Sequence, residues 1–269
     1  MAAIPVLSTV WSQSHKQDAH TFSFLDLPRE LRDLIYAYTF HVSGTIFIYT
    51  KDPTQPERRV RAKIVRHRNI GKPEPQSVYK HISMGLLRTC RQLHAETAPV
   101  LYGDNIFRIW VMNKDHLALE YRQLIRRVIF TAESSHRIFG PRDLDAVSYG
   151  WRNKFWPSIL DGGEKALAQF PNVENITVPM NTGEAPGWTP VMFAIGGKTA
   201  ERRIELAAEW MLERSPLKDE RLRDFLHLEL VPPPGSIFKW EYAGSRFAPD
   251  EDDWDCTEFE NAFELMKVL

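Results

Sequence analysis

The sequence predicts a mixed fold, α+β or α/β, in which an N-terminal helical element is followed by an irregular, loosely repeat-like α/β domain. Amphipathic helical patterns lie before residue 100. Strand-like apolar runs then recur at 125–130, 173–178 and 225–230, each beside helical sequence. This alternation favours a partly parallel sheet. The 269 residues are 43% hydrophobic and 26% charged, which is ordinary globular composition and excludes disorder over the whole chain.

The bulk composition also limits the class of protein. The formal net charge is −1, so no global electrostatic field attracts nucleic acid or an anionic membrane. The two cysteines, Cys90 and Cys256, cannot form a disulfide framework and lack metal-site spacing. No apolar run reaches membrane-spanning length, and no secretory signal is recognisable. We therefore expect a chain of the cytoplasm and/or nucleus, without cofactor or metal, that binds neither membrane nor nucleic acid.

The first helix is predicted to follow a flexible tail at residues 1–21. Asp26 is expected to cap it, Pro28 to lie in its first turn, and Glu30 to face the positive end of the helix dipole. Its apolar residues recur with helical spacing and share one face: Leu27, Leu31, Leu34, Ile35 and Tyr38.

A short strand is predicted at 44–50, and a basic loop at 51–80. We favour a solvated loop for this basic insert. Pairing with the acidic stretch 250–260, or with nucleic acid or a phosphorylated partner, is the alternative. The residues singled out as a basic patch are Arg58, Arg59, Arg61, Lys63, Arg66 and Arg68.

Further elements follow from the same patterns. A helix is expected at 86–98, ended or bent at Pro99, then a strand at 105–111. The sequence at 200–214 predicts the clearest helix, with Thr199 as its N-cap. Gly196-Gly-Lys-Thr199 is not a phosphate loop, because Met192 stands where a glycine is required. A last strand is predicted at 237–242 and a helix near 256–268. The tryptophans at 151, 156 and 188 are expected in the core.

Two N-terminal blocks resemble one family. Leu27-Pro-Arg-Glu-Leu-Arg-Asp-Leu-Ile-Tyr36 resembles the opening of the fungal F-box-like domain, Leu-Pro-x-Glu-(Leu/Ile)-Arg-x-x-Ile-(Tyr/Trp). The block that begins Leu86-Leu-Arg-Thr-Cys-Arg-Gln-Leu and ends Tyr-Gly-Asp-Asn-Ile-Phe107 resembles the second motif of that family. The resemblance covers roughly residues 22–110, and residues 111–269 would form the remaining interaction domain.

The resemblance implies a non-enzymatic adaptor. In F-box proteins, the Leu-Pro helix docks on a Skp1-type adaptor protein, and the C-terminal part captures a target for ubiquitination. Carried over, the contacts would be Leu27, Pro28, Leu31, Ile35, Leu87, Cys90 and Leu93. Two alternatives stay open: a scaffold or effector-like protein that does not bind Skp1, and an enzyme with an unrecognised site in the C-terminal part. Exposure of the first-helix contacts would favour the adaptor, and their burial against 86–98 would favour the scaffold.

Overall fold

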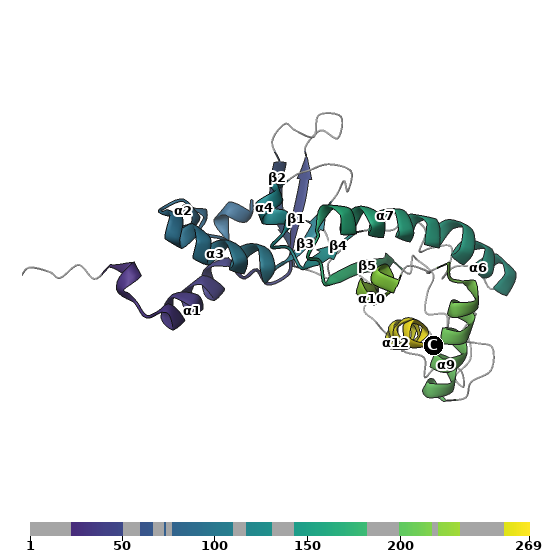
Figure 1. The fold of residues 1–269 in the computed structure, drawn as a ribbon. Coiled ribbons are helices and arrows are strands. Elements are labelled where there is room, and N and C mark those ends of the chain that lie inside the picture. The colour runs from purple at the N-terminus through teal and green to yellow at the C-terminus, as the bar shows by residue number, and fades with distance from the viewer. Residues whose placement is uncertain are drawn as a thin grey trace, which may run out of the picture.

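The structure, a computed structural model, describes residues 23–50, 60–66, 73, 77–109, 117–130, 143–181, 199–216, 220–231 and 256–269. Its described strands form one six-stranded mixed sheet in the order β2-β1-β3-β4-β5-β6 (Figure 1). Helices flank the sheet along its length, so the expectation of mixed α and β structure is confirmed.

The helices and strands divide between the two ends of the sheet. The N-terminal elements are a 3-10 turn η1 (Phe24–Asp26), α1 (Arg29–Phe40), β1 (Thr45–Thr50), β2 (Val60–Val65), a 3-10 turn η2 (Val78–Lys80), α2 (Met84–Leu87), α3 (Arg91–Gly103), β3 (Ile106–Ile109), α4 (Leu119–Arg122) and β4 (Arg127–Ile129). The C-terminal elements are α6 (Leu144–Gly150), a π-helical turn η3 (Trp151–Phe155), α7 (Trp156–Gln169), β5 (Asn175–Asn181), α9 (Ala200–Arg214), α10 (Glu220–Phe225), β6 (Leu226–Val231) and α12 (Cys256–Val268).

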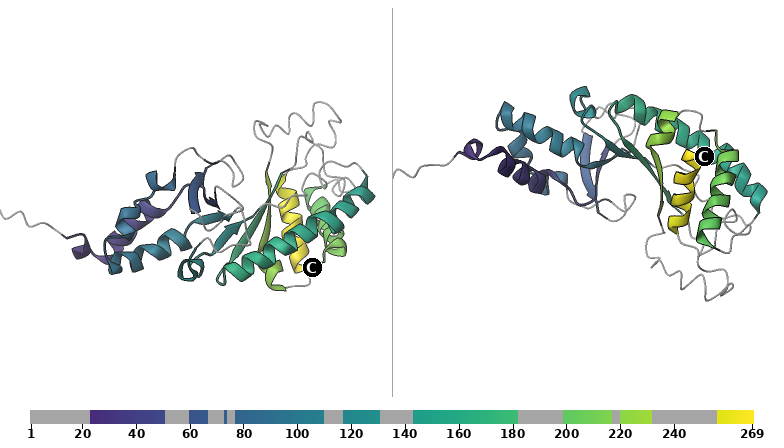
Figure 2. Two further views of the ribbon diagram at one scale, coloured as in Figure 1. Left: turned by 90° about the horizontal axis from the view of Figure 1, so that it is seen from above. Right: turned by 60° about the horizontal axis from the view of Figure 1, so that its bottom comes forward.

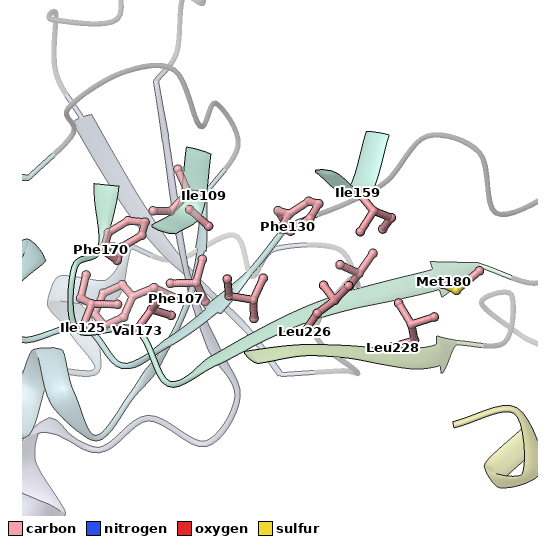
Figure 3. Packing of buried hydrophobic residues seen from close by; sticks show 14 of the residues in the cluster. Phe107, Ile109, Ile125, Phe130, Ile159, Phe170, Val173, Met180, Leu226 and Leu228 are labelled. Carbon is pink, nitrogen blue, oxygen red and sulfur yellow. The ribbon is translucent and has the colours of Figure 1, made fainter. Parts of the chain in front are cut away.

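The sheet is parallel from β1 through β3, β4 and β5 to β6, and β2 pairs antiparallel with β1 at one edge. Because register is continuous, one row of buried side chains crosses five strands: Ile46, Phe107, Val128, Ile176 and Leu226. Figure 3 shows the packing of this core around β4, β5 and β6. The predicted boundary at residue 110 therefore falls inside a single sheet, between β3 and β4.

The C-terminal core lies between the sheet and the helices α7, α9 and α12, which lie together at one end of the molecule (Figure 2). Trp151 and Trp156 are fully buried there, with ring centroids 5.5 Å apart, as the sequence predicted. Gly162 permits the close approach of α7, because a Cβ at this position would lie 2.4 Å from the Phe130 ring. Trp188 lies outside the described residues.

Helix α12 covers the outer edge of β6. Glu260 Oε1 accepts a hydrogen bond from Leu230 N at 3.0 Å, and Lys267 Nζ donates to Leu226 O at 2.9 Å. Edge strands have unpaired backbone groups that invite pairing with other chains, and these two side chains satisfy such groups. Glu258 is buried and binds Arg203 of α9 through both carboxylate oxygens, at 2.9 and 2.6 Å. The acids of the 250–260 stretch that the structure describes thus hold the C-terminal helix in place.

Several local predictions need correction. The insert predicted as a loop contributes β2 to the sheet, because its alternating residues can pair along β1. The predicted helix 86–98 is two helices, with Cys90 as the N-cap of the second. Pro99 lies inside α3 rather than ending it. Asp26 bonds the backbone N–H of Ser23, and α1 begins after Pro28 without a side-chain cap.

Other predictions agree closely. Helix α9 begins and ends as expected, and Thr199 caps it by accepting a hydrogen bond from Arg202 N at 3.3 Å. Helix α12 spans 256–268. The strand predicted at 237–242 and the tail at 1–21 lie outside the described residues.

Candidate protein-interaction face

Helix α1 buries a face that carries an arginine and two aromatic residues. The residues that point into the protein are Arg32, Tyr36 and Phe40, spaced four apart and therefore on one helical face. Tyr36 and Phe40 are fully buried, and Arg32 is 9% exposed. The sequence pattern left open whether the side with Leu31 and Ile35 is buried or exposed.

A hydrogen-bond network around Glu96 of α3 explains this orientation. Arg32 donates from Nε and Nη2 to the two Glu96 oxygens, at 3.1 and 3.0 Å, which is a bidentate pair. Tyr36 donates its hydroxyl to Glu96 Oε2 at 2.7 Å, and Gln92 donates to Oε1 at 3.1 Å. Arg32 Nη1 also donates to the Leu25 and Leu27 carbonyl oxygens. We call Arg32, Tyr36 and Glu96 the Glu96 network.

The network alters the acidity of its members. The hydrogen bond from Tyr36 lowers the pKa of Glu96, and those from Gln92 and the charges of Arg32 and Arg29 act in the same direction. Burial, followed by the bond to Glu96, raises the pKa of Tyr36 to about 12. The carboxylate is therefore charged and the phenol protonated across the neutral range, which keeps α1 fixed on α3.

The opposite side of α1 is apolar and open. Leu31 is 47% exposed, Leu34 55%, Ile35 37% and Tyr38 89%. An α-helix turns by about 100° per residue, so these four positions form a continuous stripe facing away from the Glu96 network. We call Leu31, Leu34, Ile35 and Tyr38 the α1 stripe. Single exposed apolar residues are ordinary, whereas a contiguous patch on one helix is typical of an interaction site.

The segment between the two family-like blocks does not separate their helices. Helices α1 and α3 are in contact although residues 41–90 intervene. Asn105 helps to close the chain: its amide nitrogen donates to Phe40 O at 2.9 Å, and its oxygen accepts from Val42 N at 2.8 Å. Between the two helices, the chain forms β1 and β2, which pair in the sheet, and then α2, which packs beside α3 (Figure 1).

Some of the predicted contact residues are exposed and others are buried in the core. Pro28, Leu31 and Ile35 are exposed on α1, and Leu27 is half-buried before it. Cys90 is exposed at the N-cap of α3. Leu87 and Leu93, expected beside them, are both 6% exposed and belong to the core. Their side chains pack inside the protein and are unavailable to a partner.

The predicted basic patch is only partly described. Arg61, Lys63 and Arg66 lie on β2 or directly after it, whereas Arg58, Arg59 and Arg68 lie outside the described residues. Arg61 and Arg66 are exposed, and Lys63 is half-buried. Arg61 and Lys63 therefore lie on a strand of the sheet rather than in the solvated loop we expected.

The sequence reasoning missed the residues that orient the stripe. Arg32 and Glu96 were not singled out, although both belong to the quoted motifs. The available signal was an arginine on the face opposite the apolar residues of a short helix. Leu34 and Tyr38 were assigned to the apolar face but not to the partner contacts.

The described residues offer no arrangement typical of metal chemistry, since no group of three His, Cys, Asp or Glu side chains in them is placed to hold a metal ion. Within the same part of the chain, no helix has the length and apolar character needed to cross a membrane. The chain is thus a mixed α/β protein, and the feature that stands out is the exposed apolar α1 stripe.

Comparison with known proteins adds one finding. Residues 15–128 match a family model described as a domain of unknown function, DUF7730. The matched region contains α1, the Glu96 network and the strands β1 to β3, and it ends within β4. No curated protein and no solved structure matches the chain. No enzyme family is identified by these comparisons.

Proposed function

We propose that this chain is a non-enzymatic protein-interaction adaptor whose α1 stripe docks on a Skp1-type adaptor protein, making it a substrate receptor of a Skp1–cullin-type ubiquitin ligase. The observation that carries the proposal is the exposure of Leu31, Leu34, Ile35 and Tyr38 on a helix that is held on α3 by its opposite side. Recognition of a helix through apolar residues at i, i+3, i+4 and i+7 is a common mode of protein binding.

The energetics of the stripe support a specific contact. A fully buried Leu or Ile side chain contributes about 1.5–3 kcal/mol relative to an exposed one. The three aliphatic residues of the stripe are already about half covered in the free chain, so their full burial by a partner would supply about 2–4 kcal/mol. A micromolar complex has a binding free energy of about 8 kcal/mol. The Glu96 network fixes the helix beforehand, which reduces the entropy lost on binding.

The test is binding of the full chain to a purified Skp1-type adaptor, measured by calorimetry. Leu31→Glu/Ile35→Glu places two charges in the stripe and should weaken binding at least tenfold. Leu212→Glu is the matched control, because Leu212 is an exposed leucine on α9, 41% accessible. This variant should bind like the wild type, and circular dichroism would check that all three proteins are folded.

The second candidate function is a scaffold that uses the same stripe for a different protein. It is favoured if the folded wild type does not bind the Skp1-type adaptor. That result would overturn the ubiquitin-ligase proposal, and the stripe would then be assigned to a partner of another class.

A further inference from the structure

A second surface lies where η2, α3 and α4 bring three tyrosines together. Tyr102 of α3 and Tyr121 of α4 stack with ring centroids 4.7 Å apart, and Tyr102 also stacks on Phe107 of β3 at 5.9 Å. Burial raises the pKa of Tyr102 to about 12, and the phenols of Tyr121 and Tyr79 act in the same direction, so the three hydroxyls are electrostatic neighbours. We call Tyr79, Tyr102 and Tyr121 the tyrosine cluster.

Hydrogen bonds to His94 hold one member of the cluster in place. His94 Nδ1 lies 3.1 Å from Leu87 O, and a carbonyl oxygen can only accept, so this nitrogen donates. In the neutral imidazole, Nε2 then accepts from the Tyr121 hydroxyl at 3.2 Å. The Tyr121 ring therefore has a fixed orientation, and so has Tyr102, which stacks on it. A surface that is fixed before binding loses little conformational entropy when a partner docks.

The other two tyrosines present hydrogen-bond donors beside their rings. Tyr79 is 60% exposed, and Tyr102 is half-buried. Neither hydroxyl forms a hydrogen bond with any residue of the part of the chain that the structure describes. Lys80, the next residue after Tyr79, is exposed and forms no ion pair within the same described ranges. Aromatic rings bordered by donors suit a ligand that is apolar and rich in acceptors.

A proline-rich segment has the complementary chemistry. Proline lacks a backbone N–H, so the segment offers carbonyl acceptors, and the polyproline II helix has no internal hydrogen bonds that would occupy them. Surfaces lined by aromatic side chains are a common docking site for this helix. Single-stranded nucleic acid fits less well, because its bases stack on open ring faces, whereas Tyr102 and Tyr121 stack on each other.

We propose that the tyrosine cluster binds a proline-rich segment of a partner protein in the polyproline II conformation. The rings of Tyr79 and Tyr102 contact the proline rings, and their hydroxyls, together with Lys80, donate to the backbone carbonyls of the segment. This inference stands independently of the α1 stripe. If the chain is a substrate receptor, the proline-rich segment would come from its target.

The experiment uses fluorescence anisotropy with the full chain and a labelled ten-residue proline peptide. A Ser/Gly peptide of the same length and an oligo(U) strand are the comparison probes. Tyr79→Ala should weaken binding of the proline peptide about tenfold, as loss of an aromatic contact residue does. Tyr102→Phe removes only a hydroxyl and should weaken binding about threefold. Tyr149→Ala on α6 is the matched control, because Tyr149 is also 60% exposed, and it should bind like the wild type.

Three outcomes would overturn the proposal: equal binding of the proline peptide by Tyr79→Ala and Tyr149→Ala, binding of the Ser/Gly peptide or oligo(U) at least as tight as that of the proline peptide, or no binding of the proline peptide by the folded wild type. Circular dichroism checks the fold of each variant. Skp1-type binding by Tyr79→Ala should be unchanged, so failure here and failure of the proposed function are distinguishable.

Discussion

Helices α1 and α9 have the same kind of apolar pattern and use it in opposite ways. Helix α9 buries its apolar side: Ala207, Ala208 and Met211 are fully inaccessible. Helix α1 exposes Leu31, Leu34 and Ile35. Both helices also bury an arginine that pairs with a glutamate of another helix, Arg203 with Glu258 and Arg32 with Glu96. Amphipathicity therefore does not decide which side of a helix is buried.

The difference lies in what surrounds the arginine. In α9, Arg203 lies on the same side as the apolar core residues, and both are buried together against α12. In α1, the arginine, Tyr36 and Phe40 occupy one side, and the remaining apolar residues are left outside. This contrast is the basis of the proposed docking function.

The largest effect on stability is expected in the C-terminal core. Trp151 is fully buried and contacts Trp156, Trp210 and Phe259 through its ring. Trp151→Ala should lower the free energy of unfolding by about 3–5 kcal/mol, because it removes a large buried side chain and leaves a cavity. Urea unfolding followed by far-UV circular dichroism measures this change.

The same experiment tests whether the two ends of the molecule unfold together. Because the sheet is continuous, the Trp151→Ala protein should lose its N-terminal helices in the same transition. Two separate unfolding transitions would show that α1 to α3 form an independently folding unit. Helices α1 and α9 would then belong to two different domains.

A smaller loss of stability is expected when the Glu96 network is weakened. Glu96→Gln keeps the shape of the side chain but removes its charge, so the Arg32 and Tyr36 bonds weaken. The free energy of unfolding should fall by about 1–2 kcal/mol. Affinity for the stripe's partner should fall as well, since α1 would be held less firmly. Unchanged affinity with lowered stability would mean that the network supports the fold without positioning the interface.

The pH dependence sharpens this test. The pKa of Glu96 is lowered in the folded state from an ordinary value of 4.5. Its stabilisation is therefore fully present above about pH 4.5 and is lost as pH falls through the lowered value. Glu96→Gln should show a shallower loss of stability between about pH 5 and pH 3 than the wild type. Parallel acid profiles of the two proteins, measured by urea unfolding, would contradict this role.

The sequence predicted those parts of the fold that depend on neighbouring residues. Thr199 as an N-cap and the bounds of α9 follow from local signals, and so does the strand at 45–50. The orientation of α1 could not be predicted in the same way. It depends on Arg32 meeting Glu96, which lies 64 residues further along the chain. Leu87 and Leu93 were wrongly expected among the partner contacts, because a sequence motif identifies residues but not the direction in which their side chains point.

The arrangement of residues across β1, β2 and β3 was beyond sequence reasoning for a related reason. Arg61 and Lys63 were recognised as basic, but the alignment of Lys63 with Phe47 and Arg108 exists only once three strands are paired in register. The aromatic residues of β1 read as ordinary strand formers. Pairing with β1 turned part of a basic segment into the edge strand β2.

The smallest effect on stability is expected in the α1 stripe. Leu34 is 55% exposed, so Leu34→Ala should change the free energy of unfolding by less than about 0.5 kcal/mol, helped by the high helix propensity of alanine. Met211→Ala on α9 is the matched truncation of a fully buried apolar residue and should cost about 2–5 kcal/mol. Urea unfolding of both variants measures the contrast directly. A Leu34→Ala cost comparable with that of Met211→Ala would mean that the stripe is covered by the chain itself, and the free docking surface on which the proposed function depends would not exist.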